Sequence, residues 1–165
     1  MQKPKSTILD IGFGTAVLTS KLYEHGHKID GIDFSLQMIS IARGKMPKAN
    51  LIEWDISKGF PEEVKGAKYD SIISTYTLHH LTDEQKISFI QQLLPLLNDE
   101  GKILIGDIAF ETEAQLEACR EENKAHWDDD EFYFVAAKIK TMLQEDCQCE
   151  YTQVSHCGGV FVITK

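Results

Sequence analysis

The sequence predicts an α/β protein that folds around one doubly wound, mostly parallel β-sheet. Short hydrophobic runs alternate with segments of helical periodicity over most of the chain, which is typical of a parallel sheet with helices on both faces. The last two runs flank Cys157-Gly158-Gly159, a short turn that favours an antiparallel pair. Because 165 residues suit one domain, we expect residues 1–165 to form a single unit.

Seven segments are expected to be strands, since each is short, apolar and bounded by turn residues or by a helical pattern. The first five are expected to be parallel, and the last two to form the antiparallel C-terminal pair. They are Thr7–Ile11, Lys28–Asp33, Ala49–Glu53, Tyr69–Thr75, Gly101–Ile108, Glu150–Ser155 and Val160–Lys165.

Capping residues mark the boundaries of the first helices. The helix over Thr15–His25 is expected to stop at Gly26, because glycine favours the position after a helix C-terminus. Ser35 is a suitable cap for the next helix. The segment Thr82-Asp83-Glu84-Gln85 has the capping-box spacing, and Pro95 is expected to end or kink the helix that this box opens.

Two further helical stretches are expected at about Glu113–Ala125 and Glu131–Glu145. We interpret the acidic run Asp128–Glu131 between them as a solvated helix start, favoured by the helix dipole, and not as a metal site. Four aromatic residues in this region form either a lid or part of the core, and both interpretations stay open at this point. They are Trp127, Phe132, Tyr133 and Phe134.

The composition excludes several classes of partner. The chain has 17 Lys and Arg against 26 Asp and Glu, a net charge of −9, so it lacks the basic field that nucleic acids and anionic lipids require. Its apolar runs are far shorter than a membrane span, and its start lacks the apolar core of a signal peptide. The four cysteines fit no zinc-finger spacing, so we predict no metal site. We expect a cytoplasmic protein with no nucleic-acid or membrane partner.

The end of the first expected strand carries a glycine-rich turn. The segment Asp10-Ile11-Gly12-Phe13-Gly14 lets the backbone approach a ligand and presents free N–H groups at a helix N-terminus. A dinucleotide-binding turn would have Gly or Ala where this chain has Val17. The Asp10 carboxylate would repel a pyrophosphate, but it suits a ligand that carries an ammonium and a sulfonium charge.

Two more acids follow the second and third expected strands. Asp33 lies nineteen residues after Gly14, a spacing typical of the acid that accepts both hydroxyls of a ribose. Asp55 can accept a hydrogen bond from the exocyclic amine of adenine, while the N–H of Ile56 reaches a ring nitrogen. Because ligands bind outside the carboxyl ends of the strands, we expect these acids to share one site.

Four motifs together resemble those of class I S-adenosylmethionine-dependent methyltransferases. They are Asp-x-Gly-x-Gly-Thr from Asp10, Gly-Ile-Asp-Phe-Ser-x-x-Met from Gly31, the acid Asp55, and Tyr-Asp-x-Ile-x-Ser-x-x-x-Leu-His-His-Leu from Tyr69. The resemblance extends from about Thr7 to Ile108, and it is to small bacterial enzymes of this superfamily. It implies a Rossmann-like fold with a seven-stranded sheet, S-adenosyl-L-methionine as cofactor, and methyl transfer as the reaction.

The resemblance also implies which residues bind the cofactor. Asp10 would lie near the methionine ammonium, Thr75 would offer its carbonyl to the methionine amine, and Phe34 and Met38 would cover the adenine faces. Ala16 stands where many relatives have a third glycine, and it is small enough to keep the turn. The full set of implied cofactor-binding residues is Asp10, Gly12, Gly14, Asp33, Phe34, Met38, Asp55, Ile56 and Thr75.

No catalytic base can be assigned. His79 or His80 could act as one, but we favour a packing or hydrogen-bonding role for at least one of them. Asp107, near the end of the fifth expected strand, could contact the substrate. Methyl transfer from a sulfonium needs a base only when the nucleophile arrives protonated, so a missing base does not argue against catalysis.

We therefore expect a methyltransferase that acts on a small-molecule acceptor. Similar enzymes place helices ahead of the first strand to cover the acceptor site, and here that strand starts by about Thr7. Either the chain is a truncated product, or the cover comes from Glu113–Glu145 or from another subunit. The alternatives are a non-catalytic S-adenosylmethionine-binding module and, less favoured, a nicotinamide-dependent oxidoreductase.

Overall fold

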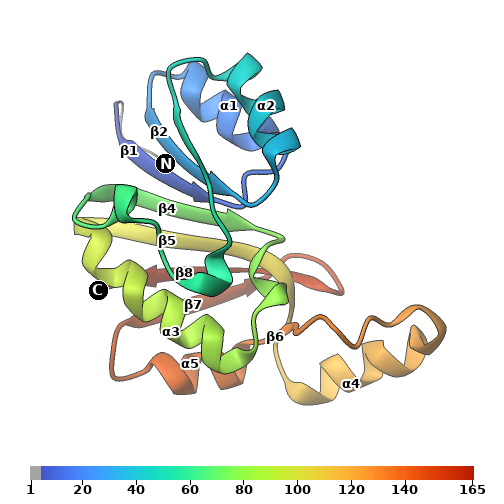
Figure 1. Cartoon of the computed structure of the whole chain (residues 1–165). Helices are drawn as coiled ribbons and strands as arrows, with labels where there is room; N and C mark the ends of the chain where they lie inside the picture. Colours follow the sequence, from blue (N-terminus) through green and yellow to red (C-terminus); the bar gives the residue numbers. More distant parts are fainter. Residues whose placement is uncertain (1–4) are drawn as a thin grey trace.

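The computed structural model describes residues 5–165 and confirms the predicted class of fold (Figure 1). The sheet runs in the order β3-β2-β1-β4-β5-β8-β7. Its first five strands in sequence are parallel, whereas β8 is antiparallel to β5 and β7 is antiparallel to β8. The strands of this path are β1 (Thr7–Ile11), β2 (Lys28–Asp33), β3 (Asn50–Glu53), β4 (Tyr69–Thr75), β5 (Leu97–Phe110), β7 (Gln148–Gln153) and β8 (Gly158–Thr164).

The helices alternate with the strands as the sequence predicts. The α-helices are α1 (Val17–Glu24), α2 (Leu36–Lys45), α3 (Asp83–Leu93), α4 (Glu113–Glu122) and α5 (Ala136–Leu143). Short 3-10 helices are η1 (Ile56–Lys58), η2 (Glu62–Val64), η3 (Leu78–His80), η4 (Leu94–Leu96) and η5 (Lys124–His126). None of the helices within residues 5–165 has the length and apolar character that crossing a membrane requires. The first four residues of the predicted single domain lie outside the described part.

The predicted helix caps are confirmed. The Ser35 hydroxyl accepts a hydrogen bond from the Met38 N–H at the start of α2. At the start of α3, Thr82 and Gln85 form the reciprocal capping box, which satisfies two N–H groups that the helix itself leaves unpaired. Pro95 lies in η4, directly after α3, where it ends the α-helix.

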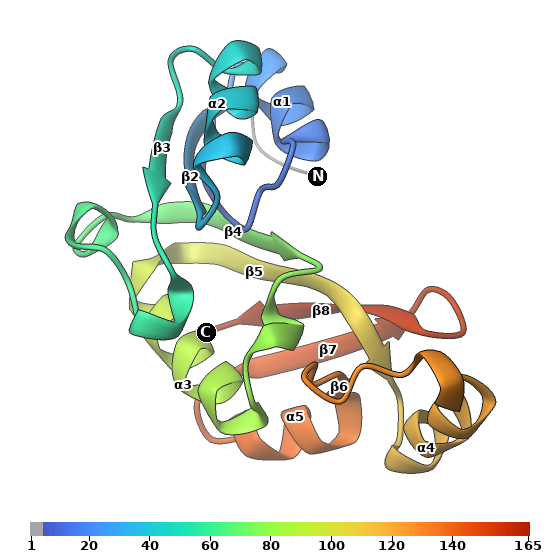
Figure 2. The same cartoon turned by 45° about the vertical axis from the view of Figure 1, so that its right-hand side comes forward.

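Helices cover both faces of the sheet (Figures 1 and 2). On one face, α1 and α2 enclose a small apolar cluster that includes Ile8, Phe13 and Ile39. On the other face, α3 and α5 pack over a larger cluster that includes Leu9, Ile90 and Ile139. Adjacent residues of β1 therefore point into different clusters, as expected for the alternating side chains of a strand buried on both faces.

The C-terminal antiparallel pair is confirmed, but its turn differs from the prediction. Gly158 and Gly159 belong to β8 and do not form the connection itself. A Cβ at Gly159 would lie 2.2 Å from the hydroxyl of Tyr151, so this position accepts only glycine while the tyrosine ring packs there. The glycine therefore serves a close cross-strand contact, which a turn-based interpretation does not anticipate.

The helix predicted over Glu131–Glu145 begins later than expected, and the acidic run before it is not a helix start. Phe134–Val135 forms a two-residue strand, β6, which pairs with Ala109–Phe110 of β5, and α5 starts only at Ala136. Within the acidic run, the Asp128 carboxylate accepts a hydrogen bond from the Asp130 N–H, so the side chain stabilises a turn instead of a helix. Burial of the Phe134 ring against Phe161 outweighs the local helical pattern.

Helix α4 extends away from the rest of the molecule in both views (Figures 1 and 2). None of its residues is buried, and its N-terminus is capped by the Thr112 hydroxyl. The chain returns from α4 through residues 124–133, where the Phe132 N–H donates to the carbonyl of His79 at 2.7 Å. We call the part of this path after η5, residues 127–133, the return segment; the hydrogen bond holds it against η3.

A buried lysine anchors the return segment. Lys86 of α3 is 0% exposed, and its ammonium donates to the carbonyl of Phe132 and lies 3.4 Å from an Asp83 carboxylate oxygen. The same ammonium lies 4.4 Å from the centre of the Phe134 ring, within range of a cation–π interaction. Burial lowers the pKa of Lys86, against the opposing effect of Asp83.

Replacing Lys86 by alanine should destabilise the fold strongly. The variant leaves the Phe132 carbonyl without its donor and opens space beside the Phe134 ring, so we expect the free energy of unfolding to fall by about 3 kcal/mol. Urea-induced unfolding followed by circular dichroism measures this change. Lys65→Ala removes a lysine from an exposed pair with Glu62, and this control should change stability by less than about 0.5 kcal/mol. Equal effects of the two substitutions would contradict the anchoring role.

Candidate functional site

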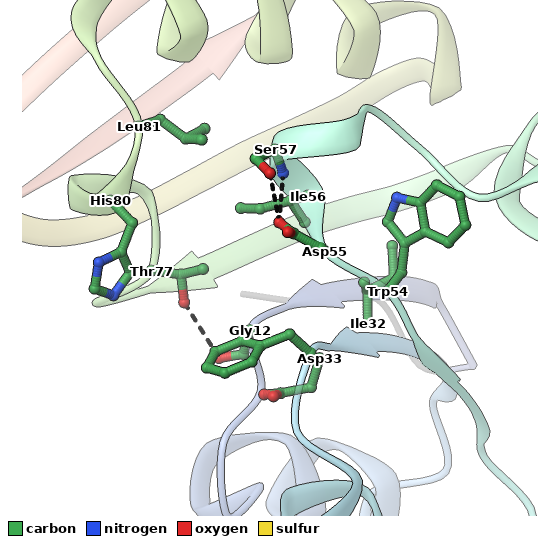
Figure 3. Close-up of a pocket in the computed structure, with 11 residues that line it drawn as sticks. Gly12, Ile32, Asp33, Trp54, Asp55, Ile56, Ser57, Thr77, His80 and Leu81 are labelled. Carbon is green, nitrogen blue, oxygen red and sulfur yellow. Dashed lines mark hydrogen bonds between the residues drawn. The ribbon is translucent and has the colours of Figure 1, made fainter.

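A pocket of about 400 Å³ opens at the edge of the sheet where β1, β2 and β4 end (Figure 3). Its volume lies within the range typical of small-molecule sites. Its walls come from the turn after β1, the end of β2, the segment between β3 and η1, and the segment after β4. The lining residues are Gly12, Ile32, Asp33, Phe34, Trp54, Asp55, Ile56, Ser57, Thr77, His80 and Leu81.

The turn after β1 depends on the missing side chain of Gly12. This residue has φ of +72°, and a Cβ there would lie 2.0 Å from the hydroxyl oxygen of Thr77. Thr77 follows β4, and its hydroxyl donates to the Gly12 carbonyl at 3.4 Å (Figure 3). Gly12 therefore lets the ends of β1 and β4 approach each other. Ala16, at the end of the same turn, keeps the turn in a left-handed conformation with φ of +62°.

Asp33, at the end of β2, is held by the backbone on both carboxylate oxygens. Oδ2 accepts from the Gly14 N–H and Oδ1 accepts from the Ser35 N–H, each at 3.0 Å. Each carboxylate oxygen has a second lone pair, so both retain capacity to accept from a ligand. The two backbone bonds fix the direction in which the carboxylate meets the pocket.

Asp55 faces the pocket from the opposite wall (Figure 3). Its Oδ1 accepts from both the N–H and the hydroxyl of Ser57, at 2.9 and 2.7 Å. These two bonds lower the pKa of Asp55, so its carboxylate is charged at neutral pH. Ile56 is the first residue of η1, where the helix supplies no acceptor for its N–H. Asp55 and Ile56 thus present an acceptor and a donor side by side.

Asp10 lies outside the pocket lining, beneath the turn after β1. It is 3% exposed, and its carboxylate accepts a hydrogen bond from the hydroxyl of Thr19 in α1. Burial raises the pKa of Asp10 to about 7; the Thr19 hydrogen bond opposes this shift, and the charge of Asp33 adds to it. The ammonium-binding role that the resemblance implies for Asp10 stays a prediction.

The structure brings five of the nine predicted cofactor-binding residues into the pocket lining. These are Gly12, Asp33, Phe34, Asp55 and Ile56. Gly14 contacts Asp33 from just outside the lining, and the Thr75 carbonyl, 3.0 Å from the Thr77 hydroxyl, shares the single proton of that hydroxyl with the Gly12 carbonyl. Met38, in the first turns of α2, also lies outside the lining. The cofactor-binding roles of all nine residues stay predictions.

Sequence reasoning did not single out several lining residues, notably Trp54, Thr77 and Leu81. Trp54 directly follows β3, and its indole N–H donates to the Gly59 carbonyl at 3.1 Å, which leaves the ring to form a wall. Tyr76, which directly follows β4 and lies outside the lining, has φ of +50° and an exposed ring. For Trp54 and Thr77 a signal was available in their positions one and two residues after a strand, whereas Leu81 lies beyond η3 and carried no such signal.

The two histidines after β4 have different surroundings. His80 lines the pocket, whereas His79 is buried with its Nδ1 atom 2.8 Å from an Asp107 carboxylate oxygen. This hydrogen bond raises the pKa of His79, and burial opposes the shift. Asp107 also accepts from the N–H of Leu78 and of Ile108, so it organises η3. His79 thus has the hydrogen-bonding role that the sequence favoured for one of the pair.

The aromatic cluster is divided between core and surface. Phe134 is buried, whereas Phe132 is exposed. Trp127 and Tyr133 stack edge to face with ring centres 5.0 Å apart, and the Tyr133 ring centre lies 6.3 Å from that of His79. The core interpretation is therefore confirmed for Phe134, and the lid interpretation of the other three residues stays a prediction.

Comparisons with known proteins agree with this architecture. A family described as a methyltransferase domain matches residues 2–159. An uncharacterised methyltransferase of Bacillus cereus is 31% identical over 174 residues, which cover 100% of this chain and 80% of the relative. Another, from Oceanobacillus iheyensis, is 38% identical over 112 residues, which cover 68% of this chain; the match spans only about half of that relative, 51%.

A solved structure supports the same assignment of fold. Magnesium protoporphyrin IX methyltransferase from Synechocystis, with bound SAH, has a TM-score of 0.73 and 18% identity, covering 98% of this chain and 75% of its own. The strand order and the pocket at the strand ends define a Rossmann-like methyltransferase fold. This chain belongs to the methyltransferase domain family.

The raised pKa of Asp10 predicts how pH affects the stability of the fold. Its ordinary value is 3.8, so between about pH 4 and pH 7 the folded protein keeps a proton that the unfolded chain has released. Stability conferred by this proton is lost as pH rises through that range. In Asp10→Asn the side chain carries no titratable proton, so this loss of stability does not occur. The free energy of unfolding of the variant, minus that of the wild type, should therefore be larger at about pH 7.5 than at about pH 5.

Urea unfolding of both proteins at the two pH values measures this difference. Asp99→Asn, an exposed aspartate near the start of β5, should keep a constant difference from the wild type and serves as the control. A constant difference for Asp10→Asn as well would show that Asp10 titrates normally in the folded protein.

Proposed function

We propose that this chain binds S-adenosylmethionine in the pocket at the strand ends and transfers its methyl group to a small-molecule acceptor. The observation that carries the proposal is that Asp33 and Asp55 lie on opposite walls of one pocket, with Gly12 beside Asp33 (Figure 3). A nucleoside needs an acceptor for its ribose hydroxyls and an acceptor for its adenine amine. These two acids are placed to supply them.

The residues present fit such a ligand. A Cβ at Gly14 would meet no atom within 4 Å, so space is open beside the N–H groups of the turn. Asp33 is fixed by two backbone bonds and can accept from the ribose without reorganising, which is the advantage of a preorganised site. The Phe34 side chain is 74% exposed at the pocket, where a stacked adenine ring would cover it.

The opposite wall fits the edge of adenine. Because both Ser57 bonds reach Oδ1 of Asp55, its Oδ2 atom is available to accept from the exocyclic amine. The neighbouring Ile56 N–H can donate to a ring nitrogen. A charged acceptor beside a neutral donor matches adenine and disfavours a base that presents a carbonyl in place of the amine.

Bound S-adenosylmethionine would supply a methyl group on a sulfonium, which is already a good leaving group. The protein then has to hold the acceptor in line with the methyl carbon and the sulfur, an effect worth up to about 7–11 kcal/mol in rate. Thr77 and His80 line the same pocket and are candidates to position an acceptor there. The proposal needs no general base for an acceptor that arrives deprotonated.

A small-molecule acceptor is supported by the charge of the chain. A net charge of −9 opposes binding to nucleic acid, whose phosphates require a basic surface. The name of the Synechocystis relative, magnesium protoporphyrin IX methyltransferase, shows that this fold serves small acceptors in another protein. The proposal keeps the acceptor open within that class.

Asp33→Ala tests the proposal directly. Calorimetric titration with S-adenosylhomocysteine, the demethylated product, should give one site for the wild type and at least tenfold weaker binding for the variant, because charged hydrogen bonds to the ribose are lost. Tritium from methyl-labelled S-adenosylmethionine should enter the small-molecule fraction of a cell extract with the wild type and much less with the variant.

Asp99→Ala is the matched control. It removes an exposed aspartate near the amino end of β5, whereas the pocket lies at the carboxyl ends of the strands. Its binding should equal that of the wild type. Binding of NAD without binding of S-adenosylhomocysteine would contradict the proposal, and label found only in protein or nucleic acid would contradict the choice of acceptor.

Asp55 should determine selectivity for adenine. Deamination of S-adenosylhomocysteine replaces the amine with a carbonyl and gives S-inosylhomocysteine, which Asp55 cannot bind through the same hydrogen bond. The wild type should prefer the adenosyl compound by at least tenfold, and Asp55→Ala should lose most of this preference. Competition titrations with both compounds measure the ratio. An unchanged ratio would assign adenine recognition to other residues.

A further inference from the structure

Three potential metal ligands meet beside the pocket, although they come from separate parts of the chain. His79 and His80 lie in η3, and Glu131 lies in the return segment. One ligand atom from each of the three residues lies within 4.8 Å of the others. The hydrogen bond from the Phe132 N–H to the His79 carbonyl holds Glu131 next to η3.

The surroundings of His79 leave one ring nitrogen directed toward this cluster. Its Nδ1 atom is engaged with the buried Asp107, whose carboxylate is in turn fixed by two backbone N–H groups. Its Nε2 atom lies 3.7 Å from Oε1 of Glu131. Histidines that bind metals almost always donate their other ring N–H to a carboxylate or a carbonyl in this way.

Glu131 is oriented by a comparable second contact. The Tyr133 hydroxyl donates to Oε2 of Glu131 at 2.6 Å, and this leaves Oε1 directed toward His79. Tyr133 is itself held by the edge-to-face contact with Trp127. In both His79 and Glu131, one polar atom is thus held by a neighbouring side chain. The other two atoms, Nε2 of His79 and Oε1 of Glu131, face each other.

The spacing suits a tetrahedral ion. Two ligands bound to zinc at about 2.1 Å lie roughly 3.4 Å apart, close to the separation of His79 Nε2 from Glu131 Oε1. That separation, 3.7 Å, is too long for a hydrogen bond. The ring centres of His79 and His80 lie 4.3 Å apart, and a ring nitrogen of the exposed His80 lies within 4.8 Å of the ligand atoms of His79 and Glu131.

The charge of the cluster also favours a cation. The carboxylates of Asp107 and Glu131 lie beside His79 and favour a positive charge there, whereas the ammonium of Lys86 opposes one. The Lys86 ammonium is already engaged by the Phe132 carbonyl and by Asp83. The alternative is a protonated His79 that bridges the two carboxylates without a metal ion. This alternative does not explain why His80 lies beside the same two side chains.

We propose that His79, His80 and Glu131 bind one divalent cation of the zinc type at the rim of the pocket. Three protein ligands leave a fourth position open, as in catalytic zinc sites. His80 also lines the pocket, so an acceptor with an oxygen or sulfur donor could occupy that position and lose its proton more readily. This role in activating the acceptor rests on the proposed function, whereas the binding of the cation does not.

Titration of chelator-treated protein with Zn²⁺ alone tests the site. The wild type should bind one equivalent, and His80→Gln and Glu131→Gln should each weaken binding at least tenfold, since each removes one of three ligands. Co²⁺ in place of Zn²⁺ should give the visible absorption bands of a four- or five-coordinate site in the wild type only. His126→Gln, which removes an exposed histidine of η5, is the matched control and should bind as the wild type does.

Loss of zinc affinity in both ligand variants, with unchanged circular dichroism and melting temperature, would support the site. Absence of binding by the wild type, or binding that neither variant weakens, would overturn it and leave the protonated histidine bridge. S-adenosylhomocysteine is titrated separately into the same proteins without metal. Zinc binding without cofactor binding would refute only the proposed function, and cofactor binding without zinc binding would refute only the metal site.

Discussion

The close approach of the β1 and β4 ends is the constraint on which the rest of the site depends. Gly12 has no side chain, and the Thr77 hydroxyl occupies the place where a Cβ would be. This contact sets the direction of the chain after β4, and therefore the position of η3 with its two histidines. In the same turn the Gly14 N–H donates to the Asp33 carboxylate, so the turn also fixes the acid at the end of β2.

The acids of the strand ends have different surroundings, and their different chemistry follows from this. Asp55 is exposed and receives two hydrogen bonds from Ser57, so it is held in the charged form. Asp10 is buried with one hydroxyl donor, so its charge is destabilised near neutral pH. Asp107 is buried, accepts hydrogen bonds from two backbone N–H groups and lies 2.8 Å from Nδ1 of His79. For Asp10 and Asp55, burial and the number of hydrogen-bond donors together set the direction in which the pKa is shifted.

The return segment connects the half of the fold that carries the recognisable motifs to the part where the resemblance ends. Lys86 holds Phe132 and Phe134 from α3, and the Phe132 N–H holds the His79 carbonyl. A region that carries no recognisable motif thus forms one wall beside η3. Helix α4, which precedes the return segment, has no buried residue and extends away from the rest of the molecule (Figure 2).

The sequence by itself determined the sheet, most helix boundaries and the acids of the pocket, because these follow from local periods, caps and the glycine turn. The strands Thr7–Ile11, Lys28–Asp33 and Tyr69–Thr75 have the predicted bounds. Only the tertiary structure decided that Phe134 starts a strand and that Glu131 reaches His79. Both depend on contacts between residues far apart in the chain, where burial of a ring or a buried ammonium outweighs local helical preference, and no local pattern records such contacts.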